Sequence, residues 1–124
     1  MVSKDKDLYD VVVLGGGAGG APAAIRASQL GGNVAIIESR DFGGQCMNRG
    51  CIPFGHMMVA SNQLVIGGAD KDMGLTFQEI PIDYPTLRKR QDELITFMRQ
   101  GVTSTLKKNN VEIIAGKGRI VGRG

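Results

Sequence analysis

The sequence is poor in aromatic residues and has no long apolar run. It contains no tryptophan, and aromatic residues make up 5% of its 124 residues. No hydrophobic stretch approaches the roughly 20 residues that a membrane-spanning helix requires, which excludes that class of protein. The amino-terminal residues 1–7 are polar as well. We therefore expect a soluble, cytoplasmic protein that does not associate with a membrane.

A large excess of one charge is also absent. The formal net charge is +3, and basic residues alternate with acidic ones, as in residues 88–93. Without a motif for RNA or DNA binding, this pattern is typical of a solvated helix face and does not indicate a nucleic-acid partner. The length of 124 residues limits the chain to one modest domain or to part of a larger protein. The sequence has no internal repeat and no linker.

Glycine, in contrast, is abundant, with 19 residues in the chain, about twice the usual rate of about 7%. The glycines cluster between apolar segments, which is typical of loops in an α/β chain. Three short apolar runs predict strands buried in a parallel sheet, at residues 10–14, 33–38 and 111–115. Helical spacing predicts three helices, at residues 18–30, 53–66 and 84–109, the last with Asp83 as its N-cap. We expect a glycine- and aspartate-rich turn at residues 67–74 and an irregular stretch from there to Asp83.

A glycine-rich fingerprint lies between the first expected strand and the first expected helix. Gly15, Gly17 and Gly20 form the pattern GxGxxG. In this context the first glycine permits a tight turn, the second lets a pyrophosphate approach the backbone, and the third lets the helix pack closely on the strand. The helix N-terminus, with Ala18 and Gly19, would offer N–H groups to the phosphates. A glycine-rich turn without a ligand is the alternative.

The two cysteines of the chain, Cys46 and Cys51, follow this fingerprint. Five residues of regular α-helix rise about 7.5 Å, whereas a disulfide needs Cα atoms about 4.4–6.8 Å apart. If the cysteines bond, residues 46–51 cannot form a regular helix. Cys51 would then lie at the mouth of a helix, where the partial positive charge and Arg49 favour a reactive thiolate. Two unrelated, buried free cysteines are the alternative.

An acidic residue completes the expected nucleotide site. Glu38 lies 18 residues after Gly20, at the end of the second expected strand, where it would accept hydrogen bonds from an adenosine ribose. The fingerprint does not separate FAD from NAD. A dithiol beside a dinucleotide needs a two-electron carrier that exchanges with thiols, and this favours a flavin.

Residues 43–53 resemble the redox motif of the pyridine nucleotide-disulfide oxidoreductases. The resemblance continues from Tyr9 to Val121, includes residues 100–102, 106–111 and 116–118, and is strongest to the dihydrolipoamide-oxidising members. It implies a Rossmann-like FAD-binding domain with a three-layer parallel sheet, incomplete as given. Residues 1–124 would form its amino-terminal part, and the NAD-binding and dimerisation domains would lie outside this chain.

The resemblance also implies roles for individual residues. Cys46 would be the interchange thiol that reacts with the substrate, and Cys51 would lie against the flavin and exchange electrons with it. The implied FAD contacts are Gly15, Gly17, Ala18, Gly19 and Gly20 for the pyrophosphate, Glu38 for the ribose, Gly44, Gln45 and Cys46 for further phosphate and flavin atoms, and Gly118 for the adenine.

At the level of the whole protein, the resemblance implies an NAD(P)-dependent disulfide oxidoreductase. Hydride would pass from dihydrolipoamide, or from another small dithiol, through the cysteine pair and FAD to NAD(P). We expect a homodimer at full length and no turnover by the 124-residue chain alone. The other functions open to the sequence are a mercuric or disulfide reductase, a non-catalytic FAD-binding or thiol-switch module, and an NAD-binding domain with incidental cysteines.

Two positions depart from the family pattern. Gly55 stands where the family has a lysine near the reactive flavin nitrogen, and Gln45 replaces the usual threonine. The first change removes a charge that tunes the flavin, and the second puts one phosphate hydrogen bond in doubt. We hypothesise that His56, the single histidine, replaces part of the missing charge. The alternative is an ordinary polar residue early in a helix.

Overall fold

The structure, a computed structural model, describes residues 8–69, 74 and 81–122. Its strands are β1 (Val11–Leu14), β2 (Val34–Glu38) and β3 (Glu112–Ala115). They form one parallel sheet in the order β1-β2-β3. Each strand falls where the sequence predicts it, and the expected Rossmann-like α/β fold is confirmed.

The helices are α1 (Gly20–Gln29), α2 (Gly44–Arg49), α3 (Cys51–Ala69) and α4 (Tyr84–Lys108). The short α2 is absent from the sequence prediction, and α3 is longer at both ends than the predicted helix at residues 53–66. Residues 67–69 belong to α3, so the turn predicted to begin at residue 67 starts too early. Most of the remaining predicted turn and irregular stretch lies outside the described residues.

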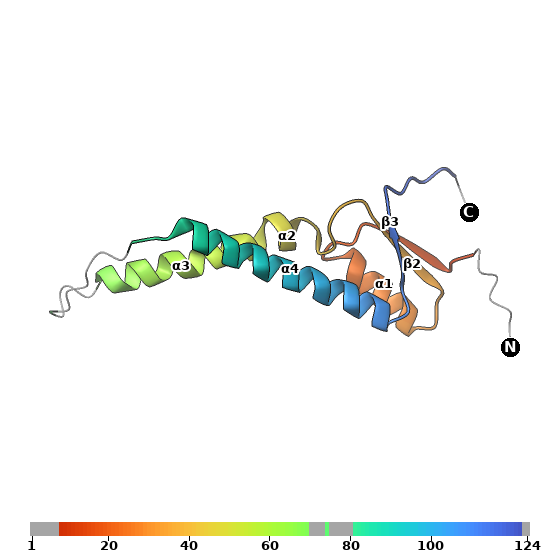
Figure 1. The fold of residues 1–124 in the computed structure, drawn as a ribbon. Helices are drawn as coiled ribbons and strands as arrows, with labels where there is room; N and C mark the ends of the chain where they lie inside the picture. The colour runs from red at the N-terminus through yellow and green to blue at the C-terminus, as the bar shows by residue number, and fades with distance from the viewer. Residues whose placement is uncertain (1–7, 70–73, 75–80, 123–124) are drawn as a thin grey trace.

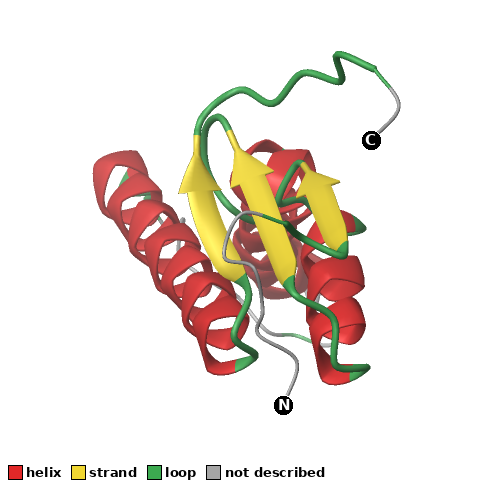
Figure 2. Ribbon diagram, turned by 90° about the vertical axis from the view of Figure 1, so that its right-hand side faces the viewer, coloured by secondary structure: helices red, strands yellow, loops and turns green. Residues whose placement is uncertain are grey.

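The hydrophobic core lies between the sheet and two helices. Figure 2 shows the helices on one face of the sheet, and Ala24, Val34, Ile36 and Leu106 are fully buried there. The small side chains of Ala21 and Ala24 allow α1 to approach the strands closely. Consecutive side chains of a strand point to opposite faces, so the core is one layer of helices on one layer of sheet.

Among the described residues no helix or strand covers the other face of the sheet, although Ala35 of the central strand β2 is fully buried there. Val13 of β1 packs on the core, so its neighbours Val12 and Leu14 point to the opposite face. Their side chains are 48% and 47% exposed. The described part of the chain therefore contains two layers of the expected three-layer domain.

Helices α3 and α4 run side by side in an arm that extends away from the sheet (Figure 1). The Gln91 side chain of α4, which is 2% exposed, donates a hydrogen bond to the Pro53 carbonyl of α3 at 2.8 Å. The predicted cap of α4 is confirmed, because Asp83 Oδ1 accepts a hydrogen bond from the Thr86 N–H at 3.1 Å. No helix in the described residues is both long and apolar enough to cross a membrane.

Candidate functional site

The glycine fingerprint forms the turn between β1 and α1. Gly15 has φ of +99°, a left-handed conformation that favours glycine. A Cβ atom on Gly20 would collide with the carbonyl oxygen of Gly15, so the start of α1 can approach the turn only with glycine here. The close helix–strand contact predicted from the sequence is thus present.

The amino-terminal end of α1 has the features of an anion site. Gly19 is its N-cap, no side chain of the described residues caps the helix there, and the first turn contains no acidic residue. The Ala21 N–H donates to the Gly17 carbonyl at 3.1 Å and Pro22 has no N–H, but the helix dipole still favours negative charge at this end. The chemistry of this turn therefore fits a phosphate group.

Glu38, at the end of β2, lies directly beside this turn. Its Oε2 accepts a hydrogen bond from the Gly16 N–H at 2.7 Å, and its Oε1 accepts one from the Arg40 N–H at 2.9 Å. Partial burial raises the pKa of Glu38, but the hydrogen bonds from Gly16, Arg40 and Ser39 outweigh it and lower the pKa below its usual range. A fixed, ionised carboxylate therefore stands at the carboxyl edge of the sheet.

The start of the cysteine motif packs on the glycine turn. The Gly43 N–H donates to the Gly16 carbonyl at 2.8 Å. A Cβ atom on Gly44, the first residue of α2, would lie 2.7 Å from the Cα atom of Gly17. Two motifs that are separate in the sequence thus share one surface. Gln45 is exposed at the start of α2.

Gly118 lies at the same edge of the sheet. The nearest atoms to a Cβ placed there belong to the side chains of Leu14 and Ile37, near the carboxyl ends of β1 and β2. Ligands of open α/β sheets bind at the carboxyl ends of the strands. The structure therefore gathers the glycine turn, Glu38, Gly44 and Gly118 around one edge.

Cys46 and Cys51 form a disulfide with Cα atoms 4.8 Å apart. Regular helix is interrupted between them, because α2 ends at Arg49 and α3 begins at Cys51. The prediction that bonded cysteines exclude a regular helix over residues 46–51 is confirmed. Cys51 is also the first residue of α3, so its sulfur lies at the helix mouth.

The two sulfur-bearing residues face different surroundings. Cys46 is half-buried and lines an apolar cavity of about 430 Å³ between α1, α2 and α4, whose other lining residues include Ala21, Ile25, Ile52, Met98 and Val102. Cys51 is exposed and opens on a separate hollow of about 640 Å³ that Arg49, Phe54 and Arg88 also line. Reagents of different chemistry could therefore reach the two ends of one disulfide.

A polar cluster beside α2 was not foreseen from the sequence. Arg99 of α4 forms an ion pair with Asp41 at 3.3 Å and donates a hydrogen bond from Nε to Asn48 Oδ1. The Asn48 amide donates in turn to the carbonyls of Gly44 at 2.8 Å and Phe42 at 3.1 Å. Arg99 and Asn48 are 51 residues apart in the chain, so no local pattern could have joined them.

His56 is a residue of α3, and its side chain faces α4. It lines a cavity of about 490 Å³ together with Leu87 and Arg90, and its Nδ1 is buried with no hydrogen-bond partner among the described residues. The hollow beside Cys51 is lined without His56. That His56 replaces part of the missing charge stays a prediction. A Cβ atom on Gly55 would meet open space, so this position could hold a larger side chain.

Comparison with known proteins gives consistent matches. The sequence model of the family described as pyridine nucleotide-disulphide oxidoreductase matches residues 9–124. The dihydrolipoyl dehydrogenase of Chlamydia muridarum is 38% identical over 117 residues, and dihydrolipoyl dehydrogenase 3 of Pseudomonas putida is 40% identical over 118 residues. These alignments cover 93% and 94% of this chain but 25% of each relative, so the chain spans about a quarter of their length.

A solved structure agrees with the sequence matches. The chain superposes with a TM-score of 0.72 on the HOCl-induced flavoprotein disulfide reductase RclA from Escherichia coli, solved as a Cu(II) complex. The two are 25% identical, and the match covers 90% of this chain and 22% of the other.

Proposed function

Because the chain belongs to the pyridine nucleotide-disulphide oxidoreductase family, we propose that it is the amino-terminal, FAD-binding part of a flavin-dependent disulfide oxidoreductase. The observation that carries this proposal is the Cys46–Cys51 disulfide, which directly follows a loop packed on the dinucleotide fingerprint. The length of the matched relatives supports a longer protein with separate NAD(P)-binding and dimerisation domains.

The residues at the carboxyl edge of the sheet fit FAD. Gly15, Gly17, Ala18, Gly19 and Gly20 would hold the pyrophosphate, Glu38 the ribose, Gly44, Gln45 and Cys46 further phosphate and flavin atoms, and Gly118 the adenine. The uncapped start of α1 and the ionised state of Glu38 support these contacts. When bound, FAD supplies a two-electron acceptor for the thiol pair.

The chemistry of the pair follows from its surroundings. A substrate thiolate attacks the Cys46 sulfur, which breaks the disulfide and leaves Cys51 as a thiolate. The second substrate thiol, once deprotonated, attacks the substrate's other sulfur, which is bonded to Cys46. This attack breaks the mixed disulfide and releases Cys46 as a thiolate. The substrate leaves as a disulfide, and its two electrons remain on the cysteine pair. Cys51, which is exposed, would be the thiol that delivers them to FAD held at the carboxyl edge of the sheet.

We further propose dihydrolipoamide as the substrate, because the curated relatives are named dihydrolipoyl dehydrogenases. The full-length protein would work as a homodimer, and the 124-residue chain alone would lack turnover. A related mercuric or disulfide reductase is the second candidate, favoured by the structural match to a flavoprotein disulfide reductase.

Anaerobic reduction of the FAD-loaded, full-length protein tests the assignment. Half-reduction of the wild type should produce long-wavelength absorbance from a Cys51 thiolate in contact with flavin. Cys46→Ser should retain this absorbance, because it leaves Cys51 free, and Cys51→Ser should lose it. Absence of bound flavin, or the same absorbance after Cys51→Ser, would overturn the proposed roles.

A further inference from the structure

Helix α4 contacts the chain both before and after Cys51. Before Cys51, the Arg99 guanidinium binds the side chains of Asn48, which lies between the two cysteines, and of Asp41, which precedes both. After Cys51, the Gln91 side chain donates to the carbonyl of Pro53 at 2.8 Å. Both contacts come from one continuous helix, so α2 and the start of α3 are attached to the same rigid element.

Gln91 differs from its neighbour Arg90 in burial and in the partner it binds. Gln91 is the buried polar residue of the described chain, with 2% of its surface exposed, and Arg88 Nη1 donates to its Oε1 at 2.6 Å. A buried amide of this kind is costly to leave unpaired, so its bond to Pro53 is held firmly. Arg90, in contrast, has a side chain that is 76% exposed and pairs with Glu93 inside α4.

We propose that Gln91 and Arg99 are positioning residues for the redox pair, an inference that rests on the proposed function. When the disulfide opens, no covalent bond other than the backbone holds α2 and the start of α3 together. The two anchors keep Asn48 and Pro53 on α4, so the thiols stay within reach of each other. The entropy lost on re-forming the disulfide is then smaller, and the disulfide is more stable relative to the dithiol.

The sign of the effect separates positioning from electrostatics. If the anchors act by position, loss of either one makes the disulfide easier to reduce. If Arg99 acted by its charge, it would stabilise thiolates, and its loss would make the disulfide harder to reduce. Gln91 is neutral, so Gln91→Met changes no charge of its own, although it also removes the acceptor of Arg88, which lines the hollow beside Cys51.

The test is the equilibrium of the full-length protein with dithiothreitol under anaerobic conditions. Each dithiothreitol gives two electrons and two protons to the cystine, which yields two protein thiols and one cyclic dithiothreitol disulfide. Alkylation and mass spectrometry of the peptide with both cysteines report the reduced fraction. Wild type is compared with Gln91→Met, Arg99→Gln and the matched control Arg90→Gln, with thermal melting to confirm that each variant is folded.

We expect Gln91→Met and Arg99→Gln each to raise the equilibrium constant for reduction roughly 3- to 10-fold, the range that corresponds to about one backbone residue gaining freedom in the dithiol. Arg90→Gln should match the wild type. Wild-type values for both variants, or a lower constant for Arg99→Gln, would overturn the positioning role while leaving the proposed function intact. A wild-type protein whose cysteines form no disulfide with a stronger thiol oxidant such as diamide would instead refute the proposed redox pair.

Discussion

Single glycines determine how closely the parts of the site approach one another. Gly20 and Gly44 each stand where a Cβ atom would overlap another segment, the carbonyl of Gly15 in one case and the Cα of Gly17 in the other. The backbone of the nucleotide turn is thereby left accessible, and the cysteine motif begins directly on it. The shape of the site therefore depends on positions that have no side chain as well as on the polar groups around it.

Substitution of Gly20 by alanine should destabilise the protein by about 1–3 kcal/mol, the usual cost of forcing an extra methyl group into a packed site. The added Cβ would push α1 away from the turn at Gly15. Gly19→Ala is the matched control, because Gly19 has an ordinary φ of −92° and open space at its Cβ position. Urea unfolding of both variants measures the difference, and equal midpoints would contradict the close contact.

At the scale of elements, the anchored start of α4 is a feature that the sequence predicts correctly. Asp83 accepts hydrogen bonds from the Thr86 hydroxyl at 2.6 Å and from the Thr86 N–H at 3.1 Å. These bonds lower the pKa of Asp83 below its ordinary value, with the side-chain bond to Thr86 as the larger cause. The ionised carboxylate therefore stabilises the folded helix.

Removal of this cap by Asp83→Ala should lower the melting temperature at neutral pH. The contribution of a carboxylate with a depressed native pKa is fully present above the unfolded pKa, about 3.9 for aspartate. It is lost as the pH falls through the lower native pKa. The difference between Asp83→Ala and wild type, followed by circular dichroism, should hence shrink below about pH 4.

Asp83→Asn is the control for this experiment, because asparagine can cap the same N–H without a charge. It should retain most of the neutral-pH stability and show a weaker pH dependence. A melting difference for Asp83→Ala that stays constant from neutral pH to pH 3 would count against the ionised cap.

The sequence predicts the elements that follow local rules and misses those that depend on distant contacts. The buried runs of β1, β2 and β3 and the cap at Asp83 carry their own signals. The short helix α2 does not, because its residues are held by a disulfide and by Arg99 from far along the chain. The GxGxxG turn was predictable because it has a local sequence signal, as the strands do. The Arg99 cluster was not, because its residues come together only in the folded chain.

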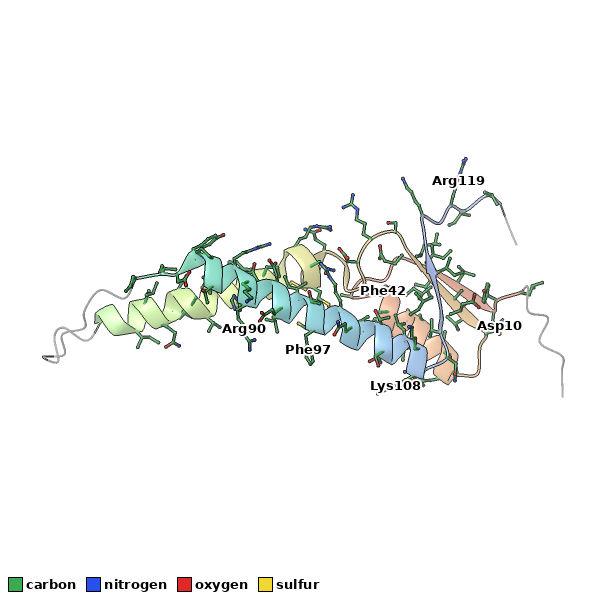
Figure 3. All side chains as sticks on the ribbon, viewed as in Figure 1. Asp10, Phe42, Arg90, Phe97, Lys108 and Arg119 are labelled. Atoms are coloured by element: carbon green, nitrogen blue, oxygen red, sulfur yellow. A yellow bond between two sulfur atoms is a disulfide. The ribbon has the colours of Figure 1, made fainter. Side chains whose placement is uncertain are left out.

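At the scale of the whole molecule, apolar side chains remain exposed on two separate surfaces. One is the uncovered face of the sheet, with Val12 and Leu14 about half exposed. The other is the arm of α3 and α4, where Phe97 is 73% exposed and projects from α4 (Figure 3). Exposed apolar area beside the open edges of a three-stranded sheet favours association with other chains.

We predict that the 124-residue chain, expressed alone, dimerises or aggregates and binds FAD weakly. The sheet face should contribute more to this association than the arm, because it combines apolar side chains with unpaired strand edges. Val12→Thr with Leu14→Thr should therefore shift the association to higher protein concentration, measured by light scattering after gel filtration. Phe97→Ser, which changes the arm, is the control and should have a smaller effect. A monomeric chain that melts cooperatively and retains FAD through gel filtration would disprove the prediction, because an uncovered sheet face would then be compatible with an independently stable nucleotide domain.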